Sequence, residues 1–319
     1  MNAQEPLLPT GAPSSRPTSL RRRAALSLLG FSIVTGILVF ELAGRRHQFA
    51  TALHAAPLWL LALAAILAVV ALLARTEAWY LCVRAAGGTV GRRIMFRAAG
   101  VGYLASVLNG SLGVAARITS LRRSAPGSVP RVPALIAAEI PIITVEIALV
   151  AIFSFTLISP LHLPWWIPFI AVVVTGSAVL ALRRFSQRHR AGLWAGLAAM
   201  HSGRGRMVVL VLVAVCAQIA RNWLVLRAVG VHVSVFDAMA LLIALFTLGQ
   251  LPIGPSLGAA ATVLILGSHG VAATAAAGVM LTVTGTVGSI TYAGWAVTDR
   301  LFAGRVTVAP EVAVAPMKA

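Results

Sequence analysis

The stretch SLGVAARITSL at residues 111–121 returns as SLGAAATVLIL at residues 256–266, with six of the eleven positions identical. Each copy belongs to an apolar segment that is interrupted by Asn, Gly, Ser or Pro: LNGSLG at 108–113 and LPIGPSLG at 251–258. Irregular backbone at membrane depth is tolerated only where protein or a water-filled cavity surrounds it. In a membrane protein, the two interruptions therefore predict a pair of re-entrant or broken helices.

The composition places the chain in a membrane. Of its 319 residues, 59% are hydrophobic and only 11% are charged, whereas soluble domains carry about 25% charged residues. The net charge of +18 comes from arginines that gather beside apolar segments, at 21–23, 92–97, 122–131, 183–190 and 204–206. This pattern is typical of cytoplasmic loops near anionic headgroups, so we expect no nucleic-acid partner.

Crossing the bilayer core takes about 20 apolar residues. The sequence predicts six such spans, at 24–43, 55–74, 132–158, 164–182, 207–226 and 271–298. Together with the interrupted segments 98–118 and 236–266, they predict an all-α polytopic membrane protein. The transmembrane domain is expected over 24–300, between a disordered cytoplasmic tail at 1–23 and a second cytoplasmic tail at 301–319.

A wider repeat surrounds the opening pair. WYLCVRAAG at 79–87 parallels WLVLRAVG at 223–230, with Trp79 opposite Trp223, and the offset grows only from 143 at the Arg-Ala-x-Gly element to 145 at the SLG element. The predicted halves are about 55–158 and 207–298. The basic loops place both termini in the cytoplasm of the cell, so the halves are inverted in the cell membrane. Matching interrupted segments in inverted repeats indicate a transporter's binding site.

Ionisable residues within the membrane are costly and are candidates for function. Arg117 lies in the first SLG copy, where a guanidinium can hold a phosphate through two hydrogen bonds. In the other interpretation, Arg117 extends to the cytoplasmic headgroups. Glu139 and Glu146 are seven residues apart and share a helix face. We expect Glu139 to pair with Arg117 or another cation, or either carboxylate to be a structural partner of nearby polar groups.

Other candidates are polar or helix-breaking residues at the interruptions. Asn109 and Gln250 precede the two breaks and are expected to face a cavity, although hydrogen bonding between helices is the commoner role of such amides. The predicted substrate site is completed by residues of the SLG and Leu-Pro elements: Gly113, Pro252 and Gly258.

A second polar group lies on the span at 207–226. Gln218, Arg221 and Asn222 form a polar patch there. In the repeat alignment Arg221 stands opposite Glu77, which suggests an ion pair between the halves. Sequence motifs of hydrolases, nucleotide-binding loops and metal sites do not occur, so we expect no enzyme activity, metal or cofactor.

These elements resemble the transmembrane region of the lysylphosphatidylglycerol synthases, a flippase-like family, over about residues 25–300. Gly113 and Arg117 match its G-E-x-x-R element, and Glu139 begins its E-R-x-x-D element. The second half has its R-A-x-G element at 227–230 and its L-P at 251–252, and SLG at 256–258 matches the start of its G-x-G-x-x-E element. At four positions where the family has an ionisable residue this chain has an apolar one, namely Val114, Ile140, Ile143 and Ala261.

The resemblance implies that the chain moves an anionic phospholipid or a lipid-linked headgroup between leaflets. An alternative hypothesis is a membrane subunit that does not transport and instead scaffolds or regulates an envelope-lipid enzyme. Because the resemblance does not include the soluble aminoacyl-transferring domain of the fused synthases, we do not expect this chain to make lysylphosphatidylglycerol.

Overall fold

The computed structural model describes residues 46–107, 110–158, 163–188, 197, 204–248, 257–267 and 270–306, and this part of the chain folds into helices without strands. The helices are α2 (Arg46–Ala55), α3 (Leu58–Ala85), α4 (Arg92–Ser106), α5 (Gly110–Ser124), α6 (Val132–Ala137), α7 (Ile140–Phe153), the 3₁₀ helix η1 (Ser154–Leu157), α9 (Trp166–Arg188), α10 (Arg204–Ala228), α11 (Val235–Leu248), α12 (Leu257–Leu266) and α13 (Val271–Val306).

Five stretches among the described residues are long and apolar enough to cross a membrane, at 58–85, 132–157, 166–187, 205–228 and 271–302. They correspond to five of the six predicted spans, and the predicted span at 24–43 lies outside the described residues. Four helices are longer than predicted. Helix α3 continues to Ala85, α9 to Arg188 and α13 to Val306, past the predicted start of the tail at 301, and α10 extends beyond both of its predicted ends. The chain is therefore a multi-pass, all-α membrane protein.

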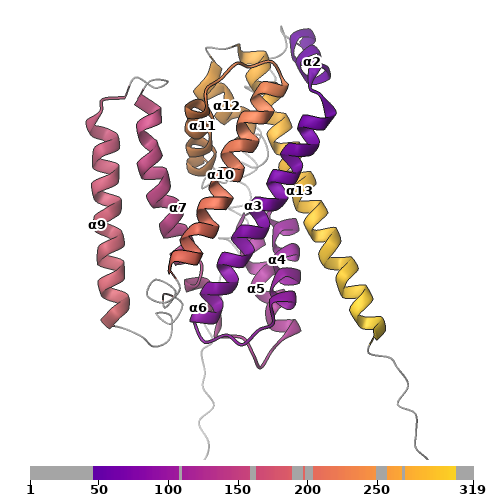
Figure 1. Cartoon of the computed structure of the whole chain (residues 1–319), viewed down its shortest axis with the longest axis vertical. Coiled ribbons are helices and arrows are strands. Elements are labelled where there is room, and N and C mark those ends of the chain that lie inside the picture. Colours follow the sequence, from indigo (N-terminus) through magenta and orange to yellow (C-terminus); the bar gives the residue numbers. More distant parts are fainter. Residues whose placement is uncertain are drawn as a thin grey trace, which may run out of the picture.

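Two antiparallel helices form the centre of the molecule (Figure 1). Helices α3 and α10 pack along each other more extensively than any other described pair. Helix α13 crosses them and also contacts α2, α4 and α12. Small residues allow this close packing: a Cβ added to Gly288 of α13 would lie 2.8 Å from the Cβ of Ala68 on α3. Close approach at small side chains is a main source of helix association in membranes.

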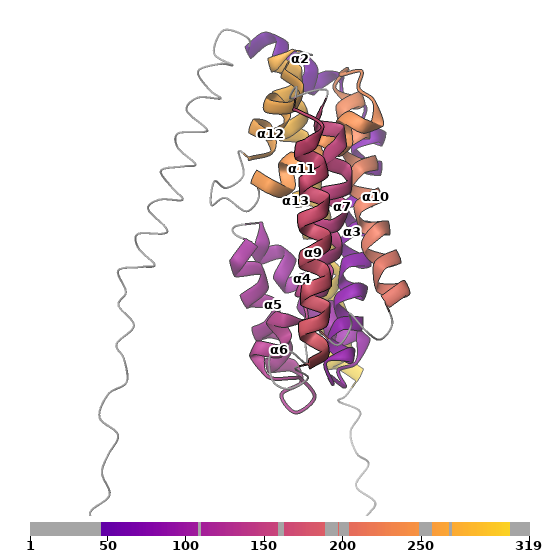
Figure 2. The ribbon, with the colours of Figure 1, turned by 90° about the vertical axis from the view of Figure 1, so that its left-hand side faces the viewer.

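Two helical hairpins lie at opposite ends of this centre. The α4–α5 hairpin occupies the lower half of Figure 1 and the α11–α12 hairpin the upper half, and the turned view of Figure 2 agrees. In the lower hairpin, a Cβ added to Gly113 would lie 2.6 Å from the Cβ of Ser106 and 2.9 Å from the carbonyl oxygen of Gly102. Gly113 therefore sits where the backbones of α4 and α5 approach each other.

Helices α3 and α10 end with the same backbone geometry. Gly87 and Gly230, which follow them, have φ angles of 91° and 80°, in the region that glycine adopts without strain. In both, the N–H of the residue after the glycine donates to the carbonyl five residues earlier at 3.0 Å: Gly88 to Val83, and Val231 to Leu226. The repeated Arg-Ala-x-Gly element thus has the same local structure in both copies.

An arginine stacks on an aromatic ring in the last turns of both helices. Arg84 lies 5.7 Å from the ring centroid of Tyr80, and Arg227 lies 4.2 Å from that of Trp223. Both pairs are four residues apart, so Trp223 occupies the place of Tyr80. The predicted alignment paired the two tryptophans, Trp79 and Trp223, because they are identical. The 143-residue offset of the Arg-Ala-x-Gly element instead pairs Trp223 with Tyr80, so the predicted alignment was wrong by one residue.

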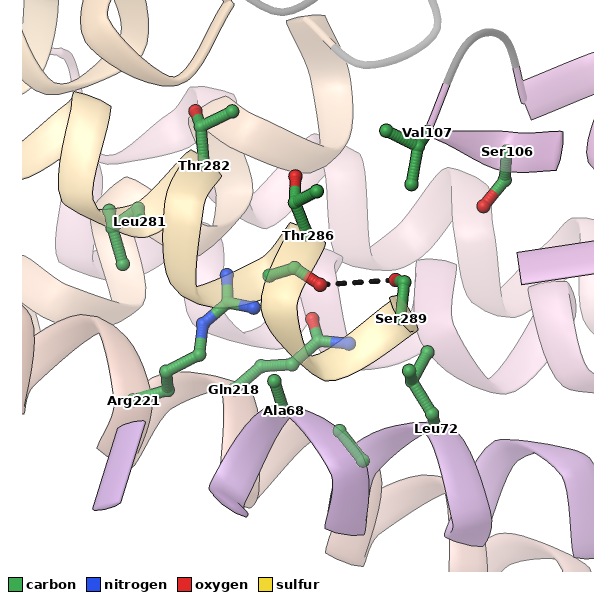
Figure 3. A pocket seen from close by; sticks show the side chains of 12 residues that line it. Ala68, Leu72, Ser106, Val107, Gln218, Arg221, Leu281, Thr282, Thr286 and Ser289 are labelled. Carbon is green, nitrogen blue, oxygen red and sulfur yellow. Dashed lines mark hydrogen bonds between the residues drawn. The ribbon is translucent and has the colours of Figure 1, made fainter. Parts of the chain in front are cut away.

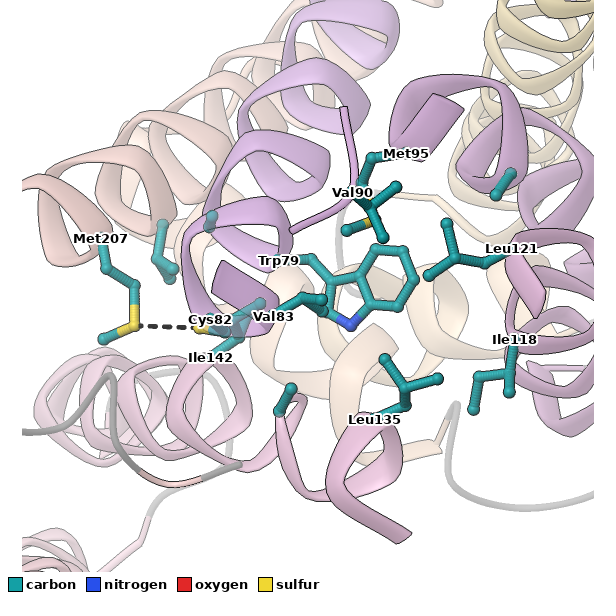
Figure 4. Packing of buried hydrophobic residues seen from close by; sticks show 14 of the residues in the cluster. Trp79, Cys82, Val83, Val90, Met95, Ile118, Leu121, Leu135, Ile142 and Met207 are labelled. Carbon is teal, nitrogen blue, oxygen red and sulfur yellow. Dashed lines mark hydrogen bonds between the residues drawn. The ribbon is translucent and has the colours of Figure 1, made fainter. Parts of the chain in front are cut away.

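Trp79 instead fills the interior of the lower half. It is fully buried with Met95, Leu121, Leu135 and other apolar side chains from α3, α4, α5, α6, α7 and α10 (Figure 4). In a membrane such a ring stabilises the fold through its packing contacts rather than through its removal from water. This cluster joins the lower hairpin to the central helices.

Helix α9 lies at the edge of the molecule and packs mainly on α7 (Figure 1). Its side chains Phe169, Val173, Val174 and Leu180 are 50–60% exposed. Water does not stabilise so large an apolar face, whereas lipid chains do. We therefore assign this face to the bilayer.

Candidate functional site

A cavity of about 330 Å³, lined by both apolar and polar side chains, lies among α3, α4, α10 and α13. Its described wall consists of Ala68, Ala71, Leu72, Ser106, Val107, Gln218, Arg221, Leu281, Thr282, Gly285, Thr286 and Ser289. Ser106 is the last residue of α4 and Val107 follows it, so the cavity extends to the end of the first helix of the lower hairpin. Its α3 residues, 68–72, lie at the middle of that 28-residue helix. The cavity therefore lies near the centre of the membrane region.

The polar wall comes mostly from one face of α13. Thr282, Thr286 and Ser289 are spaced i, i+4 and i+7, which places them in line on one side of a helix. The hydroxyls of Thr282 and Ser289 donate to the carbonyls of Gly278 and Gly285 at 3.0 Å. The prediction missed these residues, although their helical spacing in an otherwise apolar span was a usable signal.

Arg221 supplies the charge of the cavity. Its guanidinium and the amide of Gln218 extend from α10 toward α13 (Figure 3). A Cβ added to Gly285 would lie 3.3 Å from Nη1 of Arg221, so the glycine leaves room for the guanidinium. The Nε atom is buried and has no hydrogen-bond partner among the described residues.

The described acidic side chains are all engaged away from Arg221. Glu77, Glu139, Glu146 and Asp299 form ion pairs with other arginines, and Asp237 accepts hydrogen bonds from the backbone N–H and hydroxyl of Ser234. Within the described part of the chain, no carboxylate balances the charge of Arg221. An uncompensated charge in a membrane interior is costly and marks a candidate site.

The predicted anchor, Arg117, lies elsewhere. It forms an ion pair with Glu139, at the start of α7, and its guanidinium carbon lies 4.0 Å from the ring centroid of Trp79. The predicted pairing with Glu139 is confirmed. Since the Arg117 side chain is only 7% exposed, the interpretation in which it extends to the headgroups was wrong. Arg117 does not belong to the cavity wall.

Glu146 also has a protein partner. Nη1 of Arg75, on α3, lies 2.7 Å from Oε1 of Glu146, on α7. The pairs Arg117–Glu139 and Arg75–Glu146 place the carboxylate that precedes α7 and the carboxylate within α7 against cations of other helices. The structural role that was expected as one alternative for each carboxylate thus has an identified partner.

The predicted ion pair between Glu77 and Arg221 was wrong. Oε2 of Glu77 accepts a hydrogen bond from Nε of Arg92 at 2.8 Å, and Oε1 accepts one from Nη2 of Arg206 at 3.1 Å. Because α10 runs antiparallel to α3, its first turn faces the end of α3 that carries Glu77. Arg221 lies fifteen residues further along α10, about 22 Å away at 1.5 Å per residue.

The other predicted site residues are placed only in part. Asn109, Gln250 and Pro252 lie outside the described residues. Gly258 lies in the first turn of α12, and Gly113 lies at the α4–α5 contact rather than in the cavity wall. For this group, a role in substrate binding stays a prediction.

A second groove, of about 590 Å³, runs between α5 and the segment that begins α6. Arg122 and Arg123 are exposed at its edge, and most of its wall is apolar, with Val114, Ile118, Val132 and Ile136. Its polar side chains, Thr119, Arg122 and Arg123, come from the last turns of α5, whereas those of the cavity around Arg221 come from α4, α10 and α13.

Comparison with known proteins agrees with this architecture. Residues 27–294 match the sequence model of the family described as the lysylphosphatidylglycerol synthase TM region. No curated protein and no solved structure matches the chain.

Proposed function

The chain belongs to the family of the lysylphosphatidylglycerol synthase transmembrane region, and we propose that it moves an anionic lipid or lipid-linked headgroup between the leaflets of the cell membrane. The observation that carries this proposal is the cavity around Arg221, with its polar side chains, within the membrane region. A headgroup needs polar partners while it passes through hydrocarbon, because an unsatisfied polar group there costs several kcal/mol.

The arrangement of the helices supports the proposal. We interpret the hairpins α4–α5 and α11–α12 as re-entrant elements that enter from opposite faces of the membrane (Figure 1). Antiparallel α3 and α10, with their identical C-terminal caps, are the expected result of an inverted duplication. Transporters built from inverted repeats bind their substrates near the bilayer midplane, beside interrupted helices.

The basic residues support an orientation. The start of α4, the end of α5 and the start of α10 lie at the lower end of Figure 1 and carry exposed arginines, among them Arg92, Arg123 and Arg206. Arginine-rich loops remain in the cytoplasm. We therefore propose that the lower hairpin enters from the cytoplasmic face and that α13 ends on that face.

The test is lipid translocation by the purified full chain in vesicles. Fluorescent phosphatidylglycerol is placed in both leaflets, and a membrane-impermeant reductant quenches the outer label. In empty vesicles the reductant quenches only the half of the label that lies in the outer leaflet. Translocation is expected to bring label from the inner leaflet outward, so that the quenched fraction exceeds one half. Thr286→Trp, which fills the cavity, is expected to slow this exchange about tenfold or more, as loss of a required binding site would.

Val174→Trp is the matched control, because it adds the same ring to the exposed face of α9. It is expected to leave the exchange rate unchanged. The proposal is wrong if the wild-type chain moves lipid no faster than empty vesicles. If Thr286→Trp translocates lipid at the wild-type rate, translocation does not depend on the cavity.

A further inference from the structure

We infer that the cavity binds one singly charged phosphodiester group, and that the guanidinium of Arg221 is its main contact. This inference deepens the proposed function, since it assigns the chemical class of the headgroup and the residue that recognises it. Its first basis is the charge balance, in which every described carboxylate is engaged away from Arg221. An anionic ligand supplies the missing charge.

The surroundings of Arg221 match a phosphate group. A guanidinium presents parallel N–H donors that fit phosphate oxygens in pairs. The amide of Gln218 lies beside the guanidinium on α10 (Figure 3), and Thr286 of α13 also lines the cavity, so both offer further donors for the remaining oxygens. Gly285 keeps the space beside Nη1 open, because even a methyl group there would approach to 3.3 Å.

The charge and the volume narrow the ligand further. One arginine balances one negative charge, which is the charge of a phosphodiester, whereas a phosphomonoester carries about −1.5 to −2 at pH 7. A cavity of about 330 Å³ is at the small end of ligand sites, which run from about 300 to 1,000 Å³. The site therefore accommodates a headgroup, while acyl chains stay in the surrounding lipid.

Two other arginines provide a contrast. Arg117 is already neutralised by Glu139 and stacked on Trp79. Arg227, six residues after Arg221 on the same helix, is exposed and stacks on Trp223. Of these three, only Arg221 combines a place in the cavity wall with the lack of a described acidic partner. Arg227 therefore serves as a control for loss of one positive charge from α10.

The experiment measures binding to the purified full chain in detergent by native mass spectrometry. The probes are phosphatidylglycerol, diacylglycerol with the same acyl chains, and soluble dimethyl phosphate. Wild type is expected to bind phosphatidylglycerol over diacylglycerol. Arg221→Gln is expected to weaken that binding about tenfold or more, as loss of a bidentate charged contact does, whereas Arg227→Gln leaves it unchanged.

Arg221→Lys keeps the positive charge but loses the paired N–H donors of the guanidinium. It is expected to bind phosphatidylglycerol with an affinity between those of wild type and Arg221→Gln. Because Arg221→Gln removes no ion pair among the described residues, it is expected to unfold at a temperature no lower than wild type. Competition by dimethyl phosphate would show that the phosphodiester alone is recognised. Binding of phosphatidylglycerol without such competition would assign the site to the intact lipid.

Equal affinity in wild type and Arg221→Gln overturns the inference, and so does equal weakening in Arg227→Gln or equal binding of diacylglycerol. The proposed function fails separately. If binding depends on Arg221 but the wild-type chain translocates no lipid, the binding site is supported and the transport function is wrong. If Arg221→Gln translocates at the wild-type rate, transport stands and the assigned site is wrong.

Discussion

Arg117 of α5 and Glu139 at the start of α7 form a buried ion pair against the indole ring of Trp79, and their side chains are only 7% and 10% exposed. Burying two charges costs desolvation energy that their attraction only partly offsets. The pair nevertheless connects α3, α5 and α7 at one point. The pair therefore contributes to the stability of the fold only while both partners are present.

Removing one partner of this pair is expected to destabilise the protein. Arg117→Met leaves Glu139 buried without its cation, which costs about 3–5 kcal/mol. The double variant Arg117→Met/Glu139→Leu is expected to recover most of that loss. Denaturant unfolding in mixed micelles, followed by tryptophan fluorescence, measures both effects. A single variant as stable as wild type would show that the pair makes no net contribution.

Glu77 is expected to tolerate loss of either of its partners but not of both. The side chains of Arg92 and Arg206 are 62% and 67% exposed, whereas that of Glu77 is 7% exposed. Each single change to Gln is expected to cost less than about 1 kcal/mol. The double change leaves the buried carboxylate unpaired and is expected to cost more than the sum. Additive losses in the same unfolding measurement would contradict this shared role.

The close contact within the lower hairpin predicts a strong effect of one methyl group. Gly113→Ala would place a Cβ 2.6 Å from that of Ser106, so α4 and α5 must separate, at a cost of about 1–3 kcal/mol. Gly176→Ala is the matched control, because a Cβ there meets no atom within 4 Å. Alanine also favours a helix over glycine by about 1 kcal/mol. Equal stability of the two variants would argue against tight hairpin packing.

The proposed orientation is tested with single cysteines in a chain lacking Cys82 and Cys216. Gly127 and His232 are exposed in the α5–α6 loop and the α10–α11 loop, and these loops lie at opposite ends of the molecule (Figure 1). In intact cells, a membrane-impermeant thiol reagent is expected to label His232→Cys and to leave Gly127→Cys unlabelled until the membrane is opened. The reverse pattern would invert the topology, and labelling of both from outside would contradict the opposite placement of the two loops.

The helices themselves were largely predictable, because long apolar runs bounded by polar residues have few other stable states in a membrane. The ends of the helices were less so. The run Arg75-Thr76-Glu77 looks like the end of a span, yet α3 continues through it to Ala85. Arg75 pairs with Glu146, and Glu77 pairs with Arg92 and Arg206, so polar groups that hydropathy excludes from a span are neutralised by other helices.

The sequence by itself determined the fold class and the apolar spans described here. These features depend on local composition, because a long apolar run has few stable states in a membrane other than a helix. Only the tertiary structure decided which cation each carboxylate meets, and that Arg221 rather than Arg117 belongs to the cavity wall. Spacing along one helix cannot specify which face of which distant helix lies opposite, because that depends on how all the helices pack together.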